Sequence, residues 1–142
     1  MAGIRERILA ADILVVATPT WLGQPSSVSK RALERMDAFL SETYDDGETP
    51  RSTASPGSWS SANEDGAHHC ISEISGALID IGYTIPAQAW TYWDKGPGPG
   101  EEKWLTTDER EWSITTGQTA ARNLLAVARA LRANLIPAPP HS

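Results

Sequence analysis

The chain has 142 residues, of which 40% are hydrophobic and 21% are charged, and its formal net charge at pH 7 is −6. This composition excludes collagen-like and wholly disordered classes, the negative charge disfavours a nucleic-acid partner, and the apolar runs stay below the roughly 18 residues that a membrane span needs. Because no secretory leader follows Met1, we expect a single cytoplasmic domain over residues 1–142 that needs no membrane partner.

The first segments are typical of a helix, a strand and a second helix. Residues 3–11 place isoleucines one helical turn apart and predict an amphipathic helix. Residues 13–17 are continuously apolar and rich in β-branched side chains, which predicts a buried strand of a parallel sheet. Apolar positions in 28–40 recur at helical spacing, and Ser26 or Ser27 is available as the N-cap. The order is that of one βα unit.

The middle of the chain is polar and rich in turn-forming residues. Residues 42–62 have neither helical nor strand periodicity and are predicted to be irregular. The four residues Asn63–Gly66 then offer capping side chains to a second amphipathic helix, whose C-terminal stop is Gly82.

The last third of the chain predicts one more strand and one more helix. Residues 83–90 are expected to form an edge strand, because Pro86 cannot donate to a ladder. An apolar stripe over 121–131 predicts a closing surface helix, and 136–142 a flexible tail. Helices that alternate with strands indicate an α/β fold, in which ligands bind at the carboxyl ends of parallel strands.

Three segments carry a resemblance to a known family. They are T-P-T-W-L-G-Q-P-S-S (18–27), N-E-D-G-A-H-H (63–69) and A-W-T-Y-W (89–93). Together they resemble the NADPH-dependent FMN reductases and NAD(P)H:quinone oxidoreductases of the flavodoxin-like superfamily. The resemblance implies a three-layer flavodoxin-like parallel sheet, FMN as cofactor, NAD(P)H as reductant, and a flavin or quinone-type small molecule as electron acceptor.

The resemblance also implies two loops that bind the flavin. The residues of the first loop are Pro19, Thr20, Trp21, Leu22 and Gly23, and those of the second are Asn63, Glu64, Asp65 and Gly66. The first loop can supply a flat apolar wall and close backbone approach, and the second an amide side chain and free amides at a helix start. The plainer alternatives are that Trp21 packs over a helix end and that the second loop only caps a helix.

The remaining histidines, aromatics and thiol point to no metal centre. His68 and His69 project about 100° apart on a helix and cannot share a metal ion as an i, i+4 pair would, so we expect them at a solvated or core-edge position. Trp90, Tyr92 and Trp93 could wall the substrate side of a flavin, bury against a second subunit of a homo-oligomer, or pack in the core. Cys70 has no second thiol to pair with.

Two features depart from the family pattern. The family begins with a strand, a phosphate-binding loop, a helix and a second strand, which would all precede Met1, so we expect an incomplete sheet without the FMN phosphate loop. The family also has a strand at 52–62, where this chain is polar. If the serines use T-C-N codons, the preceding reading frame permits V-Y-G-V-A-G-V-V-V-V-G, and we predict two offsetting frameshifts near Arg51 and Ala62. Resequencing the locus tests this prediction.

Three functions follow from this sequence. The first is an FMN-dependent oxidoreductase that uses NAD(P)H to reduce a flavin or quinone-type acceptor, in which the protein positions two flat rings and no catalytic nucleophile is expected. The second is an inactive truncated remnant that does not bind FMN. The third is a flavodoxin-like electron carrier without its own NAD(P)H reaction.

Overall fold

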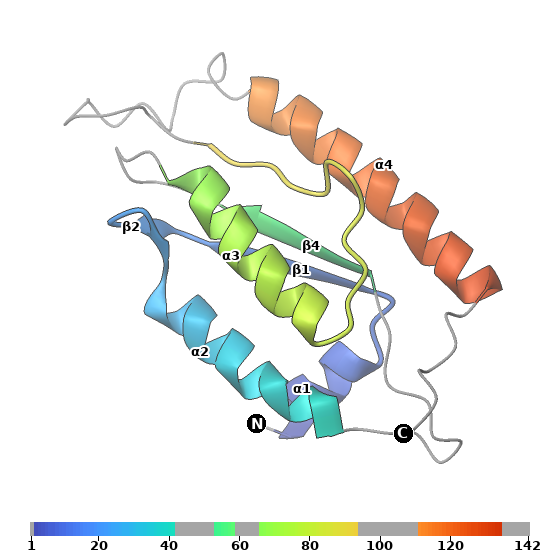
Figure 1. Cartoon of the computed structure of the whole chain (residues 1–142). Helices are drawn as coiled ribbons and strands as arrows, with labels where there is room; N and C mark the ends of the chain where they lie inside the picture. The colour runs from blue at the N-terminus through green and yellow to red at the C-terminus, as the bar shows by residue number, and fades with distance from the viewer. Residues whose placement is uncertain (1, 42–52, 59–65, 94–110, 135–142) are drawn as a thin grey trace.

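A computed structural model describes residues 2–41, 53–58, 66–93 and 111–134 (Figure 1). In chain order, its elements are α1 (Ala2–Leu9), β1 (Ile13–Thr18), β2 (Thr20–Trp21), β3 (Gln24–Pro25), α2 (Ser27–Met36), the 3-10 helix η1 (Asp37–Ser41), β4 (Thr53–Ser58), α3 (Ala67–Asp80) and α4 (Glu111–Ala133). The expected α/β alternation is confirmed. The tail at 136–142 lies outside the described residues.

The central sheet pairs β1 with β4 in parallel, with Ile13 opposite Thr53 and Thr18 opposite Ser58. The predicted parallel strand is therefore confirmed. The prediction of irregular structure over 42–62 is wrong at 53–58, because ladder hydrogen bonds join backbone groups and do not require apolar side chains. The rest of 42–62 lies outside the described residues, and the paired frameshifts stay a prediction.

The burial expected for β1 is found on one face only. Successive side chains of a strand point to opposite faces, and Leu14 and Val16 pack against the hydrophobic core. Val15 points to the other face, where it is 61% exposed. Among the described strands, β1 pairs with β4 alone, so this part of the sheet is narrower than a complete flavodoxin-like sheet.

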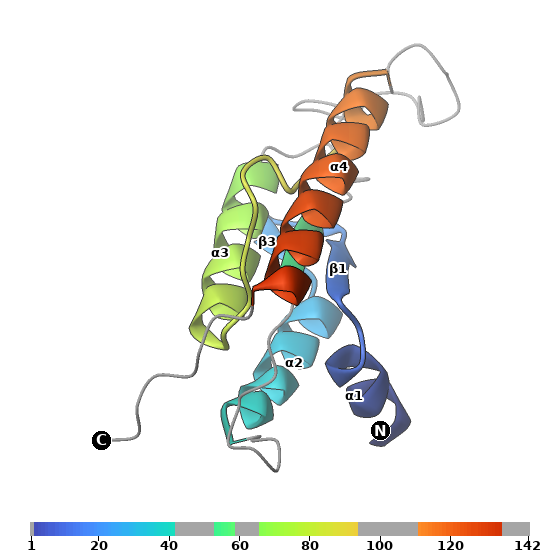
Figure 2. The same cartoon turned by 90° about the vertical axis from the view of Figure 1, so that its right-hand side faces the viewer.

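Helices cover the sheet from two sides. On one side, the core joins Leu14 and Val16 to buried residues of α2, η1 and α3 and of the segment that follows α3; these are Met36, Phe39, Ile74, Leu78 and Tyr83. On the other, α4 contacts β4 and β1, and its buried residues are Ala120, Leu124 and Ala128. Figure 2 shows β4 between α3 and α4. The described part of the chain thus has the three layers of a flavodoxin-like fold.

The ends of the helices follow the expected signals with one exception. The hydroxyl of Ser26 caps α2 by accepting from the Ser29 amide at 3.2 Å. Gly82, at φ 95°, ends α3 as expected. The N-cap of α3 is Gly66, which provides no side-chain hydrogen bond. The capping side chains expected there, at 63–65, lie outside the described residues.

The edge strand predicted over 83–90 is wrong. Thr84 forms an isolated bridge, and the rest of this segment has no ladder. Pro86 lacks an amide donor, and Gln88 adopts a positive φ of 50°. Both features interrupt strand geometry.

Side-chain hydrogen bonds with α4 hold this segment instead of a ladder. Asn123 Nδ2 donates to the Ala87 carbonyl at 2.6 Å, and Ser113 Oγ donates to the Tyr92 carbonyl at 2.6 Å. Thr91 Oγ1 donates to the Ser113 carbonyl at 2.8 Å. The segment therefore runs alongside both α3 and α4 (Figures 1 and 2). No helix in the described part of the chain is long and apolar enough to span a membrane.

Candidate functional site

The first predicted loop is a β-hairpin at the carboxyl end of β1. Trp21 pairs with Gln24 across a turn formed by Leu22 and Gly23. Both turn residues have positive φ, 49° and 72°, as type I′ hairpin turns require. Thr18 closes the base of the hairpin, because its Oγ1 accepts from the Ser26 amide at 3.0 Å.

Two apolar side chains stand out from this hairpin. Trp21 is 58% exposed and Leu22 is 87% exposed. The alternative in which Trp21 packs over a helix end does not account for this exposure. The pair is placed as an apolar wall would be, and contact with a ligand stays a prediction.

Thr20 and Pro19 take other positions. The side chain of Thr20 is fully buried, and its Oγ1 lies 3.6 Å from Cys70 Sγ on α3. Thr20 therefore points into the protein, opposite in direction to its neighbour Trp21, as strand alternation dictates. Pro19 is half-buried, and its carbonyl accepts from the Thr18 hydroxyl at 3.0 Å.

The two predicted loops meet at Gly23 and Gly66. A Cβ on Gly66 would lie 2.6 Å from Gly23 Cα, so only glycine allows this approach. Cys70 Sγ lies 3.8 Å from the Gly23 carbonyl oxygen, one turn into α3. The structure thus brings one residue of each predicted loop together, and flavin binding by these loops stays a prediction. Asn63, Glu64 and Asp65 lie outside the described residues.

A polar network fastens the hairpin to two helices. The side-chain amide of Gln24 lies 2.9 Å from His69 Nε2 on α3, and its Oε1 accepts from Lys30 Nζ on α2 at 3.2 Å. Lys30 also pairs with Glu73 at 3.0 Å, and Glu73 lies 3.4 Å from His69. Of these contacts, only the one between His69 and Glu73 has a local signal in the sequence, which is their i, i+4 spacing. We call Gln24, Lys30, His69 and Glu73 the hairpin network.

His68 points away from this network and joins an aromatic cluster. Its ring makes edge contacts with Trp90 at 5.2 Å and with Tyr92 at 5.1 Å between centroids. Trp90 and Tyr92 are stacked, with their planes inclined by 24°, and Trp112 makes an edge contact with Tyr92. We call these four residues the aromatic cluster. The described residues contain no group of three or more potential metal ligands.

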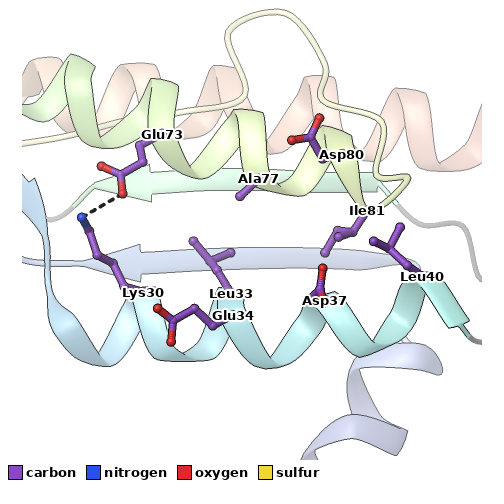
Figure 3. Close-up of a pocket in the computed structure, with 9 residues that line it drawn as sticks. All are labelled: Lys30, Leu33, Glu34, Asp37, Leu40, Glu73, Ala77, Asp80 and Ile81. Carbon is purple, nitrogen blue, oxygen red and sulfur yellow. Dashed lines mark ion pairs between the residues drawn. The ribbon is translucent and has the colours of Figure 1, made fainter.

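A groove of about 460 Å³ runs between α2 and α3 (Figure 3). The Lys30–Glu73 ion pair lies at one end of it, and Leu33, Ala77 and Ile81 line its length. Its other lining residues are Glu34, Asp37, Leu40 and Asp80. The groove has no aromatic lining, so the hairpin offers the better wall for a flat ring.

The candidate site therefore lies at the carboxyl ends of β1 and β4, where the hairpin meets the start of α3 (Figure 1). Ligands of parallel α/β sheets bind at this edge. The first helical bond of α3 runs from the Cys70 amide to the Gly66 carbonyl, so the amides of the preceding turn have no partner within the helix. An apolar wall and amides without a helical partner suit a flat ring with a polar edge.

Comparisons with known proteins identify a family and relatives. Residues 1–79 match the family described as NADPH-dependent FMN reductase. The chain is 37% identical over 131 residues to the divalent metal cation transporter MntH of Mycobacterium bovis, covering 90% of this chain and 19% of that protein. It is 36% identical over 97 residues to the 8-demethyl-8-aminoriboflavin-5'-phosphate synthase of Streptomyces davaonensis, covering 67% of this chain and 38% of that protein. The chain thus spans less than half of each relative.

Solved structures share the fold. RosB with a bound 8-demethyl-8-formylriboflavin-5'-phosphate intermediate superposes with a TM-score of 0.83 at 28% identity, covering 95% of this chain and 54% of that chain. A WrbA-like flavodoxin protein of Agrobacterium tumefaciens superposes with a TM-score of 0.62 at 13% identity, covering 92% and 74% respectively. The fold is flavodoxin-like.

Proposed function

Because the chain belongs to the NADPH-dependent FMN reductase family, we propose that it is part of an FMN-dependent oxidoreductase that uses NAD(P)H to reduce a small-molecule acceptor. The observation that carries this proposal is the meeting of the hairpin and the start of α3 at Gly23 and Gly66. The names of two similar proteins, which refer to riboflavin phosphates, support a flavin as the ligand. The cytoplasmic location expected from the sequence is part of the same proposal.

The residues at this site fit the ring portion of FMN. Trp21 and Leu22 offer exposed apolar surface for one face of the isoalloxazine. The amides of the first turn of α3, which have no partner within the helix, would be donors for its polar edge, where the helix dipole also favours negative charge. Gly23 and Gly66 allow the backbone to come close to the ring. Pro19 and the predicted second-loop residues Asn63, Glu64 and Asp65 complete the proposed ring site.

The chain's own residues bind and orient rather than react. When bound, FMN supplies the transfer of two electrons from the nicotinamide. The hairpin network holds the hairpin against α2 and α3, which keeps the apolar wall in one position. Positioning of this kind is the protein's main contribution in cofactor enzymes.

Binding of lumiflavin and of FMN tests the ring site directly. Lumiflavin has the ring without the phosphate, so quenching of its fluorescence on titration with the chain reports the ring walls alone. Trp21→Ala should weaken lumiflavin binding about tenfold, the usual scale of one lost aromatic contact. Leu125→Ala, on α4, removes a comparably exposed apolar side chain and should leave it unchanged. Equal affinities for parent and Trp21→Ala would contradict the proposed site.

Turnover separates the proposed enzyme from the other two functions. Steady-state oxidation of NADPH in the presence of FMN and an acceptor is expected of a reductase. A carrier would bind FMN without oxidising NADPH, and an inactive remnant would bind neither FMN nor lumiflavin.

A further inference from the structure

The contacts of the hairpin network fix where the proton of His69 lies. Lysine has donors only, so the contact of 3.2 Å with Lys30 Nζ requires that Gln24 turns its Oε1 towards α2. The amide nitrogen of Gln24 then faces α3, where it lies 2.9 Å from His69 Nε2. Because an amide nitrogen can only donate, His69 Nε2 must accept. The imidazole in this arrangement is therefore neutral, with its proton on Nδ1.

A second partner competes for the same histidine nitrogen. Glu73 Oε2 lies 3.4 Å from His69 Nε2, one helical turn along α3. When the ring is protonated, both of its nitrogens are donors, so Nε2 can donate to this carboxylate. The same proton places two donors opposite each other in the contact with Gln24. Protonation of His69 thus replaces the bond to the hairpin with a bond inside α3.

Rotation of the Gln24 amide does not recover both bonds. If the amide turned by 180°, its oxygen would accept from the protonated ring, but its nitrogen would then face the ammonium group of Lys30. Donor would again lie against donor. The hairpin therefore loses at least one of its two side-chain bonds to the helices, to α2 or to α3, when His69 is protonated.

Within the described ranges, the charged groups that face His69 come from two helices. Glu73 lies on the same helix, and Lys30 of α2 pairs with its other oxygen, Oε1, at 3.0 Å (Figure 3). The carboxylate can thus hold Lys30 and still accept from His69 through Oε2. The thiol of Cys70, next in sequence, turns towards the hairpin and the buried interior instead. The side chain of His69 is 55% exposed, so protons reach it from solvent.

We infer that Gln24 is a positioning residue for the proposed ring wall and that it holds the wall only while His69 is neutral. This inference rests on the proposed function, because the hairpin carries the wall. Gln24 pairs with Trp21 across the turn, so an amide fixed between α2 and α3 also fixes the backbone of the wall residue opposite. Histidine changes charge between about pH 5 and 8. The wall is held on the alkaline side of this change and released on the acid side.

Nuclear magnetic resonance of the full chain without flavin tests the first step. At about pH 7.5 the ring-nitrogen shifts of His69 should show a proton on Nδ1 and none on Nε2. On acidification, the side-chain amide signal of Gln24 should move with the same midpoint as the His69 ring. A neutral ring with its proton on Nε2 would overturn the inference, and so would a Gln24 signal that does not follow the titration.

Lumiflavin binding at two pH values tests the consequence for the wall. Lumiflavin lacks the phosphate, which itself titrates near about pH 6, so the change reports the protein. The affinity of the parent should fall about threefold from about pH 7.5 to about pH 5.5, the scale of one weak hydrogen bond. Gln24→Met has no amide and should bind at the weaker level at both pH values. Gln24→Glu offers a carboxylate to both Lys30 and protonated His69, so its affinity should not fall in acid.

The reversal in Gln24→Glu distinguishes this role from ordinary packing, which has no reason to change sign with pH. His68→Gln is the matched control, because it removes the adjacent titrating ring, which contacts Trp90 and Tyr92, and it should keep the threefold fall. Circular dichroism at both pH values establishes that each variant is folded. Equal parent affinities at the two pH values would overturn the inference, and so would a Gln24→Glu variant that weakens as the parent does. If the parent binds no lumiflavin at either pH, the proposed ring site fails, and the resonance titration alone decides the inference.

Discussion

Replacing Leu22 by glycine should stabilise the fold and weaken flavin binding at the same time. Leu22 lies at φ 49° in the hairpin turn, a conformation that costs a non-glycine residue about 1–2 kcal/mol. Its side chain is 87% exposed, so its removal sacrifices little buried area. Glycine also increases the conformational entropy of the unfolded chain, which destabilises the fold by about 0.4–1 kcal/mol and offsets part of this gain. We expect a net stabilisation of about 0.5–1 kcal/mol.

Urea unfolding measures this stabilisation. For a denaturant slope of about 1.5 kcal/mol per molar, the midpoint should rise by about 0.3–0.7 M. Flavin affinity should change in the opposite direction, because the wall loses a side chain. If a bound ring covers about 50 Å² of Leu22, the loss is about 1 kcal/mol, or about fivefold in Kd.

Leu22→Ala is the matched control. It removes the same wall but keeps a Cβ at positive φ, so it should lose flavin affinity without the gain in the urea midpoint. A lower midpoint for Leu22→Gly would refute the argument from backbone strain. A lumiflavin affinity equal to that of the parent would refute the position of the wall.

Three further experiments test the packing around the site. Gly66→Ala puts a Cβ 2.6 Å from the hairpin backbone at a φ of 154°. It should lower the free energy of unfolding by about 2 kcal/mol or more and reduce lumiflavin binding. A neutral effect in both assays would contradict the close approach. Leu78→Ala, at a fully buried core position, should lower the free energy of unfolding by about 3 kcal/mol. Ile79→Ala, at the adjacent but exposed position, should change it by less than about 0.5 kcal/mol. Similar urea midpoints for the two variants would contradict this placement of the core. A double-mutant cycle with Lys30→Met and Glu73→Gln should give a coupling of about 0.5 kcal/mol that shrinks in high salt, because both groups are partly exposed; a coupling insensitive to salt would argue against an ion pair.

Local sequence signals predicted the elements that depend on local physics. The β-branched run 13–17 became β1, the Ser26 hydroxyl capped α2, and Gly82 ended α3. The inward position of Thr20 could also be predicted, because side chains alternate along a strand and its neighbour Trp21 points outward. The family resemblance assigns residues 19–23 to one loop and does not distinguish the two faces of β2.

Elements that depend on distant partners could not be predicted. The composition of 53–58 gives no strand signal, and its strand exists through backbone pairing with β1. The hairpin network joins Gln24 to His69 across the fold, a pairing that no local spacing encodes. The segment 83–90 satisfied a strand pattern, but hydrogen bonds from Asn123 and Ser113 on α4 hold the region instead.

These bonds between α4 and the 87–93 segment have a consequence for folding. They join residues 21 to 36 positions apart, so the chain between them must close as a loop before any bond forms. The segment therefore gains these bonds only when α4 docks on the sheet, later than the local contacts of α2 and α3 with their neighbouring strands. Release of α4 would free both elements in one local unfolding unit. Hydrogen exchange should then show the amides of α4 and of 87–93 opening together, at a lower free energy than those of α3.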